Sequence, residues 1–262
     1  MIKNRFIKWL QLPEVEQMSG YNLSQFVLLR EKIIESKEFL KKLYSDFYQD
    51  IKKRIPQKSG LFGRRIIIEI GSDGGFIEKV IPETITSDVI FLPEQDLVLS
   101  AMELPFKDDS VHAFVLINVL HHIPTPYKFL KEAERCLRRQ GKIIMIEPSC
   151  SLWAKFVYKN FHYEPFYPNA DWRNPNNPIG TNGAMPWIIF CRDKIAFEKE
   201  FPMLKIHNQK QHTPLRYILS GGVSMRQILP SFTYSYIKGL EILVSFISRY
   251  FSMFMTIEVE KI

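Results

Sequence analysis

The fold is decided by the stretch Arg65-Ile66-Ile67-Ile68-Glu69-Ile70-Gly71-Ser72-Asp73-Gly74-Gly75-Phe76. A run of β-branched apolar residues ends in an acid, and a glycine-rich turn follows at once. Such a run is typical of a strand buried in a parallel sheet, and ligands of open α/β sheets bind at the carboxyl ends of these strands. Glycines let the turn adopt positive φ and let a ligand approach the backbone closely. The stretch therefore predicts a ligand site directly after a buried strand.

The spacing of the glycines argues against a dinucleotide at this turn. A dinucleotide-binding turn has the pattern G-x-G-x-x-G and places its pyrophosphate at a helix N-terminus. Counted from Gly71, the second and third glycines of that pattern are replaced by Asp73 and Phe76. The carboxylate of Asp73 would also repel phosphates.

A cationic ligand fits the same turn better. S-adenosylmethionine carries a sulfonium and an ammonium and no phosphate, so nearby carboxylates attract it. The pattern expected for it, acid-x-G-x-G-x-G, is met by Glu69, Gly71 and Gly75. It is missed at Asp73, where the adjacent Gly74 can supply the flexibility of the absent glycine. The alternative is a plain turn between a strand and a helix that binds nothing.

The residues that follow predict an alternating α/β series. The expected elements are strands at 84–89, 96–99, 113–118 and 141–147, and a helix at 126–138. This order predicts a doubly wound sheet. The second strand ends at Asp88, close to the offset of roughly 20 residues at which an acid binds ribose hydroxyls in nucleotide-binding units.

Residues 65–149 resemble a class I S-adenosylmethionine-dependent methyltransferase of the broad, type 11-like group that includes the quinone-biosynthesis methyltransferases. The resemblance is carried by Glu69-Ile-Gly71-Ser-Asp73-Gly74-Gly75, Ala101-Met-Glu-Leu-Pro105-Phe106, Asn118-Val-Leu-His121-His122-Ile and Leu137-Arg-Arg-Gln-Gly141-Lys. It implies a Rossmann-like, doubly wound, mostly parallel seven-stranded sheet with helices on both faces. It also implies an antiparallel final strand at the sheet edge.

The resemblance further implies which residues bind the cofactor S-adenosylmethionine. The implied set is Glu69, Gly71, Asp73, Gly74, Gly75, Asp88, Ser100, Ala101, Met102 and Asn118. The glycines would line the methionine part, Asp88 would bind the ribose, and Asn118 would lie beneath the sulfonium. Two positions depart from the family pattern, because Asp73 replaces a usual glycine and Ser100 stands where an adenine-binding acid is common.

Length and composition fit one α/β enzyme with appendages. A chain of 262 residues with 46% hydrophobic content can bury a full core. We expect an N-terminal helical arm at 1–60, the cofactor-binding core at 61–150, and the acceptor-pocket insertion and completion of the sheet at 151–262. No stretch reaches the roughly 18 uncharged apolar residues of a membrane span, and the start lacks a signal-like apolar core.

Cysteines and charge bear on location and partners. Cys136, Cys150 and Cys191 lack paired spacing, which predicts a reduced, cytoplasmic protein. The net charge of +7 permits an acidic partner, but the basic clusters are short and separated. Enzymes that methylate base amino groups resemble one another in an Asn/Asp-Pro-Pro-aromatic motif, whereas Asn118 is followed by Val119-Leu120-His121. Nucleic acid is therefore not an expected partner, and the oligomeric state is not predicted.

Two segments flank the core. The arm at 22–55 has apolar residues at helix spacing and is ended by Pro56. The resemblance implies that it covers the cofactor or shapes the acceptor entrance, and the alternative is a helix that only packs on the sheet. Residues 150–190 combine many aromatic side chains with prolines and directly follow the fifth strand. Because ligands bind at the carboxyl ends of parallel strands, this aromatic insertion is expected to line an acceptor pocket. The alternative is a satellite aromatic core.

The motif Phe161-His162-Tyr163-Glu164-Pro165 is the best candidate for chemistry in this insertion. Methyl transfer is an in-line displacement that chiefly requires alignment in a water-poor site. A hydroxyl acceptor also needs a base, which contributes roughly 10²–10⁴-fold. His162 and Glu164 are candidates, as are His122 and Glu147 at the carboxyl edge of the sheet. The histidines do not fall at metal-ligand spacing and no cysteine pair joins them, so no metal site is expected.

The C-terminal third predicts strands at 205–210 and 253–261, where polar and apolar residues alternate. Between them an apolar helix is expected at 236–251, with Lys238, Glu241 and Arg249 on its polar side. Core packing is the preferred interpretation of its apolar side. A lid for a lipid-linked acceptor, or shallow membrane contact, is the alternative.

The sequence thus predicts a methyltransferase that moves a methyl group from S-adenosylmethionine to a small-molecule, sugar or lipid-linked acceptor. Oxygen is the predicted acceptor atom. Two alternatives stay open. One is a nicotinamide-dependent oxidoreductase, and the other is a catalytically weak or inactive cofactor-binding or scaffold protein of the same fold.

Overall fold

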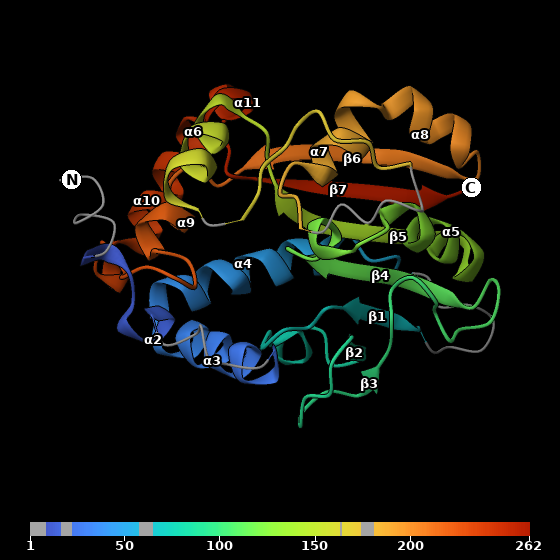
Figure 1. Cartoon of the computed structure of the whole chain (residues 1–262), viewed down its shortest axis with the longest axis horizontal. Coiled ribbons are helices and arrows are strands. Elements are labelled where there is room, and N and C mark those ends of the chain that lie inside the picture. Colours follow the sequence, from blue (N-terminus) through green and yellow to red (C-terminus); the bar gives the residue numbers. More distant parts are fainter. Residues whose placement is uncertain (1–8, 17–22, 58–64, 163, 174–180) are drawn as a thin grey trace.

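The computed structural model describes residues 9–16, 23–57, 65–162, 164–173 and 181–262. The ends of the predicted helical arm, Tyr163 and part of the aromatic insertion lie outside the described residues. Figure 1 shows a central sheet with helices on both of its faces.

The sheet has seven strands in the order β3-β2-β1-β4-β5-β7-β6. Their bounds are β1 Ile67–Ile70, β2 Thr84–Asp88, β3 Leu97–Val98, β4 Val111–Ile117, β5 Leu137–Pro148, β6 Leu204–His212 and β7 Phe254–Lys261. The strands β1 to β5 pair in parallel, and β7 runs antiparallel to both β5 and β6. The predicted mostly parallel, doubly wound sheet is confirmed.

The predicted place of the final strand is wrong. The strand β7 lies between β5 and β6, and β6 forms the edge. The reason is burial, because the residues of β7 from Phe254 to Glu258 are buried, whereas most residues of β6 are exposed. A strand that is covered on both faces belongs inside a sheet, and a polar strand tolerates the solvated edge.

The helices connect the strands and cover both faces of the sheet. Their bounds are α2 Pro13–Glu16, α3 Leu23–Ser36, α4 Glu38–Arg54, α5 Pro126–Cys136, α6 Leu152–Phe161, α7 Met185–Trp187, α8 Lys194–Glu200, α9 Arg216–Ser220, α10 Tyr234–Leu243 and α11 Ser248–Phe251. Short helical turns are η2 Ile77–Lys79, η3 Leu120–His122, η4 Ile188–Arg192, η5 Ser231–Thr233 and η6 Ser245–Ile247.

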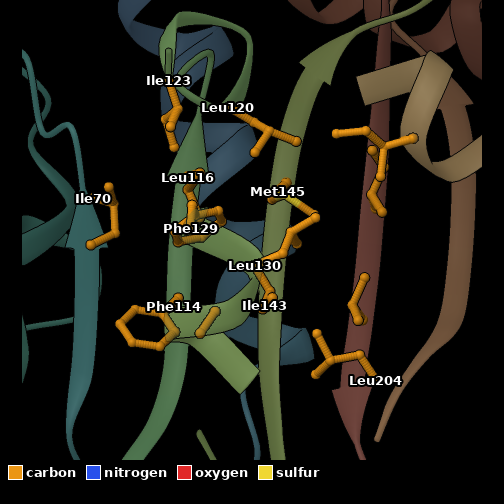
Figure 2. Close-up of a cluster of buried hydrophobic side chains, with 14 of the residues drawn as sticks. Ile70, Phe114, Leu116, Leu120, Ile123, Phe129, Leu130, Ile143, Met145 and Leu204 are labelled. Carbon is orange, nitrogen blue, oxygen red and sulfur yellow. The ribbon is translucent and has the colours of Figure 1, made fainter. Parts of the chain in front are cut away.

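One face of the sheet is covered by α5 and by the segment from α7 to α8. Figure 2 shows Phe129 and Leu130 of α5 against Phe114 of β4 and Ile143 of β5, all fully buried. The predicted helix at 126–138 ends two residues early, since Leu137 takes extended backbone and pairs with β4.

The opposite face is covered by α4 and α6. Leu40, Leu43 and Phe47 of α4 pack in a cluster with Val115 of β4. The predicted single helix of the arm is divided at Lys37, where the backbone leaves helical geometry. The buried ammonium of Lys37 donates to the carbonyl oxygens of Gly222 and Met225 at 2.5 and 2.7 Å, which fixes the break against the C-terminal part of the chain.

The predicted C-terminal helix is divided into α10, η6 and α11, and its expected orientation is wrong. Leu243 and Phe246 are 74% and 81% exposed, so the apolar side does not pack in the core. Glu241, expected on the polar side, is buried and accepts hydrogen bonds from the backbone N–H of Leu215 and from the backbone N–H and guanidinium of Arg216. Because this ion pair is buried, the side of the helix that carries Glu241 faces the protein, and Leu243 and Phe246 face outward. Among the described residues, no helix has the length and hydropathy needed to cross a membrane.

Candidate cofactor and acceptor site

The turn after β1 opens onto a cavity of about 400 Å³ at the carboxyl ends of the parallel strands. The predicted cofactor residues in its wall are Gly71, Asp73, Asp88, Ser100, Ala101, Met102 and Asn118. The helix α3 adds Val27 and Arg30, which the sequence analysis did not single out. The helix α4 packs on the sheet, as one interpretation of the arm predicted, and α3 lines this cavity.

Three predicted cofactor residues lie behind the cavity wall rather than in it. Glu69 is buried under the turn, and burial raises the pKa of its carboxyl to about 8. A Cβ atom on Gly75 would collide with the hydroxyl of Tyr48, and one on Gly74 would lie 2.6 Å from Cβ of Glu31. These two glycines permit α3 and α4 to pack closely on the turn. Glycine is therefore required at these two positions by the packing of the helices and not by contact with a ligand.

Gly71 shapes the cavity directly. Its φ is +69°, and a Cβ atom there would lie 2.7 Å from a methyl carbon of Val119. Asn118, the residue directly after β4, also has positive φ, which asparagine tolerates better than most residues. The turns after β1 and β4 can therefore approach each other closely around the cavity.

Asp73 carries the charge that the sequence analysis assigned to cation binding. One of its carboxylate oxygens lies 2.7 Å from the guanidinium of Arg30. The other, Oδ1, is buried and has no hydrogen-bond partner among the described residues. Burial raises the pKa of Asp73 to about 6, although Arg30 opposes the shift. A buried, unpartnered carboxylate oxygen beside the cavity is suited to a ligand ammonium.

Asp88 and Ser100 shape the far side of the cavity. One oxygen of Asp88 accepts hydrogen bonds from the backbone N–H groups of Val89 and Ile90, at 2.7 and 3.4 Å. The hydroxyl of Ser100 accepts from the backbone N–H of Met102 at 3.2 Å. Ser100 therefore stabilises the turn at 100–103 instead of offering the acid that the family pattern favours at that position.

The three predicted catalytic residues come together in one cluster. An oxygen of the Glu164 carboxylate lies 3.7 Å from Nε2 of His122, and the other lies 3.8 Å from Nδ1 of His162. That second oxygen also lies 3.5 Å from Nε2 of His121. His122, His162 and Glu164, which the sequence offered as alternative bases, are therefore neighbours in the fold, and His121 lies among them.

Glu147 holds this cluster in position through hydrogen bonds. One of its carboxylate oxygens lies 2.7 Å from Nδ1 of His121. The other accepts hydrogen bonds from the backbone N–H groups of Val119 and Leu120 at 2.9 and 2.7 Å. Glu147, considered as a base in the sequence analysis, is fully buried and fully bonded, so its observed role is to hold the turn η3 and the His121 ring.

The neighbouring charges set the protonation of the cluster. Burial alone would lower the pKa of His121, but the Glu147 and Glu164 carboxylates raise it to about 9. Burial and the charge on His121 lower the pKa of His122. Burial would raise the pKa of Glu164, but hydrogen bonding and charge from the three histidines lower it to about 2. At neutral pH these shifts leave Glu164 ionised, His121 cationic and His122 neutral.

A segment of the aromatic insertion brings Glu164 to the sheet. The side-chain oxygen of Asn182 accepts hydrogen bonds from the backbone N–H groups of Tyr167 and Ala184, and its backbone N–H donates to the carbonyl of His121. Asn182 is fully buried and was not singled out in the sequence analysis. Asparagine between glycine and threonine gives only a turn signal in a single sequence, so its long-range bonds could not be foreseen.

Two further cavities adjoin the cluster. A small one of about 40 Å³ surrounds Glu164 and shares Arg30, Asn118 and His122 with the cofactor cavity. An apolar one of about 390 Å³ shares Tyr158 and His162 with the small cavity. Three cavities therefore lie in sequence, with the cluster between the larger two.

Residues of the aromatic insertion line cavities and also pack in the core. Tyr158 and Phe166 line the small cavity, and Trp153 and Phe156 line the apolar one. Trp172, by contrast, is 1% exposed and belongs to the core beside the sheet.

Comparisons with known proteins agree with this architecture. A family model described as a methyltransferase domain matches residues 83–145. An uncharacterized protein of Methanocaldococcus jannaschii is 30% identical over 146 residues, which cover 52% of this chain and 68% of that protein.

Solved structures show the same fold at low identity. Geranyl diphosphate C-methyltransferase from Streptomyces coelicolor A3(2), in complex with Mg²⁺, geranyl diphosphate and S-adenosyl-L-homocysteine, is 12% identical with a TM-score of 0.52, and the match covers 89% of this chain and 84% of that one. A SAM-dependent methyltransferase from Archaeoglobus fulgidus is 13% identical with a TM-score of 0.50, covering 84% and 94%. With the family match, the sheet order and the turn at Gly71, the chain belongs to the class I S-adenosylmethionine-dependent methyltransferases.

Proposed function

We propose that this chain transfers a methyl group from S-adenosylmethionine to an oxygen atom of an acceptor bound beside Glu164. The observation that supports it best is the wall shared by the cofactor cavity and the small cavity, which contains Asn118 and His122. An acceptor in the small cavity would therefore be next to the cofactor, as an in-line displacement requires.

The proposed cofactor site is the 400 Å³ cavity. Asp73 would hold the ammonium through its unpartnered Oδ1, Asp88 the ribose, and Asn118 would border the sulfonium. Ser100, Ala101 and Met102 would border the adenine. When bound, S-adenosylmethionine supplies a methyl group already activated by its positively charged sulfur.

The chain's own residues have three tasks in this proposal. The aromatic walls at Tyr158 and Phe166 exclude water from the small cavity. The Glu164 carboxylate accepts a hydrogen bond from the acceptor hydroxyl and orients it. In this proposal the ring of His162 receives the proton, since burial lowers its pKa and leaves it neutral. Glu147 and His121 position these groups without touching the acceptor.

Of the acceptor classes left open, we propose a lipid-linked one. The cavity beyond His162 is lined mainly by apolar and aromatic side chains, including Trp153, Phe156 and Phe161, and also by Arg226. Apolar cavities of this kind favour hydrocarbon, and its volume of about 390 Å³ lies within the usual range for ligand pockets. A polar head beside Glu164 and an apolar chain in this cavity would use both spaces.

The outer surface supports contact with a membrane. Leu152 and Phe156 of α6 are exposed, and α11 packs against α6 (Figure 1). The exposed apolar residues Leu152, Phe156, Leu243, Phe246, Tyr250 and Phe251 are here named the α6–α11 surface. Exposed Lys155 and Arg249 lie on the same helices and would meet anionic headgroups. We propose that this surface rests on a bilayer, with the reaction on its cytoplasmic side.

A label-transfer experiment tests the function. The purified chain is incubated with S-adenosylmethionine labelled in its methyl group and with lipid and aqueous extracts of the source cells. We expect label in the organic phase for wild type and none for Glu164→Gln. Label confined to the aqueous extract would contradict the lipid-linked acceptor, and no label in either would favour an inactive cofactor-binding protein.

A further inference from the structure

We propose that His121, His122 and Glu164 bind a divalent transition-metal ion, for which Zn²⁺ is the best match. Metal binding by these residues is independent of the acceptor, while the role given to the ion below rests on the proposed methyl transfer. The three residues offer two imidazole nitrogens and a carboxylate oxygen, a ligand set that suits zinc in sites that keep a position open.

The atoms are already close enough to share an ion. One ligand atom from each residue lies within 4.8 Å of the others. Nε2 of His121 and Nε2 of His122 lie 3.5 and 3.7 Å from oxygens of Glu164. Ligands at about 2.0–2.2 Å from one zinc ion in tetrahedral geometry stand roughly 3.3–3.6 Å apart, so small side-chain rotations complete the site.

Both histidines are oriented as metal ligands are. A metal-binding histidine generally uses its second ring nitrogen in a hydrogen bond that fixes the ring. Nδ1 of His121 lies 2.7 Å from Glu147, and Nδ1 of His122 lies 3.2 Å from the hydroxyl of Thr181. Each ring therefore presents Nε2 toward Glu164. The pairing of His121 with Glu147 would by itself explain only the orientation of the His121 ring. The structure orients two rings, and both direct Nε2 toward the same carboxylate.

The rings of the two adjacent histidines lie close together. Here His121 and His122 lie on the short turn η3, and their ring centroids are 4.2 Å apart with the planes tilted by 38°. Linear spacing predicted no metal site, since it takes no account of this turn or of Glu164 arriving from the aromatic insertion.

His162 is left out of the ligand set. Its Nδ1 accepts a hydrogen bond from the backbone N–H of Glu164 at 3.2 Å, which fixes the loop that carries the carboxylate. His122, by contrast, is part of the wall shared by the cofactor and small cavities. An ion held there would have an open position facing the acceptor. A hydroxyl on that position would lose its proton more readily, as water does on catalytic zinc.

The test uses the full-length chain, stripped with a chelator and titrated with ZnCl₂ in a calorimeter. We expect one tightly held ion per chain in wild type. Glu164→Gln and His122→Ala should each lose more than about 100-fold in affinity, because even the groups that only orient a ligand are worth roughly 10–100-fold. His207→Ala is the matched control, since His207 is exposed on β6 and should leave Zn²⁺ affinity unchanged.

S-adenosylhomocysteine binding, measured on the same samples, separates this inference from the proposed function. Glu164 is not in the wall of the cofactor cavity, so Glu164→Gln should bind S-adenosylhomocysteine as wild type does, which also shows that it is folded. A wild-type chain that binds S-adenosylhomocysteine but no Zn²⁺ would overturn the metal site alone. Equal Zn²⁺ affinity in wild type and in both ligand variants would overturn it as well.

Discussion

Nδ1 of His121 lies 2.7 Å from a carboxylate oxygen of Glu147, and this contact joins the turn after β4 to the end of β5. Glu147 also accepts two backbone hydrogen bonds from the start of η3. The carboxylate thus satisfies three polar groups inside the protein and sets the position of the candidate catalytic cluster.

Glu147→Ala should therefore cost stability. Removing one partner of a buried ion pair leaves the other uncompensated, a loss of about 3–5 kcal/mol. Urea denaturation should show a lower midpoint with an unchanged slope. Glu198→Ala, an exposed substitution on α8, is the control and should stay within about 0.5 kcal/mol of wild type. A Glu147→Ala midpoint equal to that of the control would show that the contact is not stabilising.

Gly71→Ala should abolish measurable binding of S-adenosylhomocysteine. The residue has positive φ, and the new methyl group would collide with Val119 in the wall of the cofactor cavity. Gly239→Ala is the matched control, because no atom lies within 4 Å of the Cβ position there. The control should keep full affinity and gain roughly 0.5–1 kcal/mol of stability, as expected for alanine in place of glycine within a helix. Retained affinity in Gly71→Ala would contradict the placement of the site.

Affinity for S-adenosylhomocysteine should fall as the pH is lowered through about 6. The pKa of Asp73 is raised from 3.8 to about 6 by burial, so this carboxylate is protonated at a pH where an ordinary one is still ionised. The protonated form cannot pair with the ligand ammonium. Calorimetry between pH 5 and 8 measures the change. Asp73→Asn should bind more weakly at pH 8, by about 1.5–3 kcal/mol for a lost charged hydrogen bond, and should show little dependence on pH in this range.

Phe246→Ser combined with Leu243→Ser should weaken binding to lipid vesicles. Both side chains are largely exposed on the α6–α11 surface, and their insertion into a bilayer would remove apolar area from water. Flotation with vesicles of phosphatidylcholine and phosphatidylserine tests this. Ile195→Ser removes an equally exposed apolar side chain from α8 and should float like wild type. Equal flotation of all the proteins, or of none, would contradict the membrane contact.

Local patterns in the sequence were enough to predict the parallel part of the sheet. The apolar run before Gly71 and the strands to Glu147 each show their character within a few residues. The place of β7 depends on pairing with β6, which lies far away in the chain, and no local pattern encodes that pairing.

The same division applies to the candidate site. Gly71 and Asp73 follow β1 and Asp88 ends β2, and all three could be found from that position alone. Arg30 comes from a helix far upstream, and the bond between Glu241 and Arg216 that turns α10 over is equally non-local. Side chains that act through long-range contacts look like ordinary helix or turn residues in a single sequence.

The central claim is that a cationic methyl donor occupies the cavity beside Gly71. Isothermal titration of the wild-type chain with S-adenosylmethionine, S-adenosylhomocysteine and NAD tests it most directly. The account predicts saturable binding of the first two ligands and no heat of binding with NAD. Saturable binding of NAD, with none of either S-adenosyl compound, would contradict it.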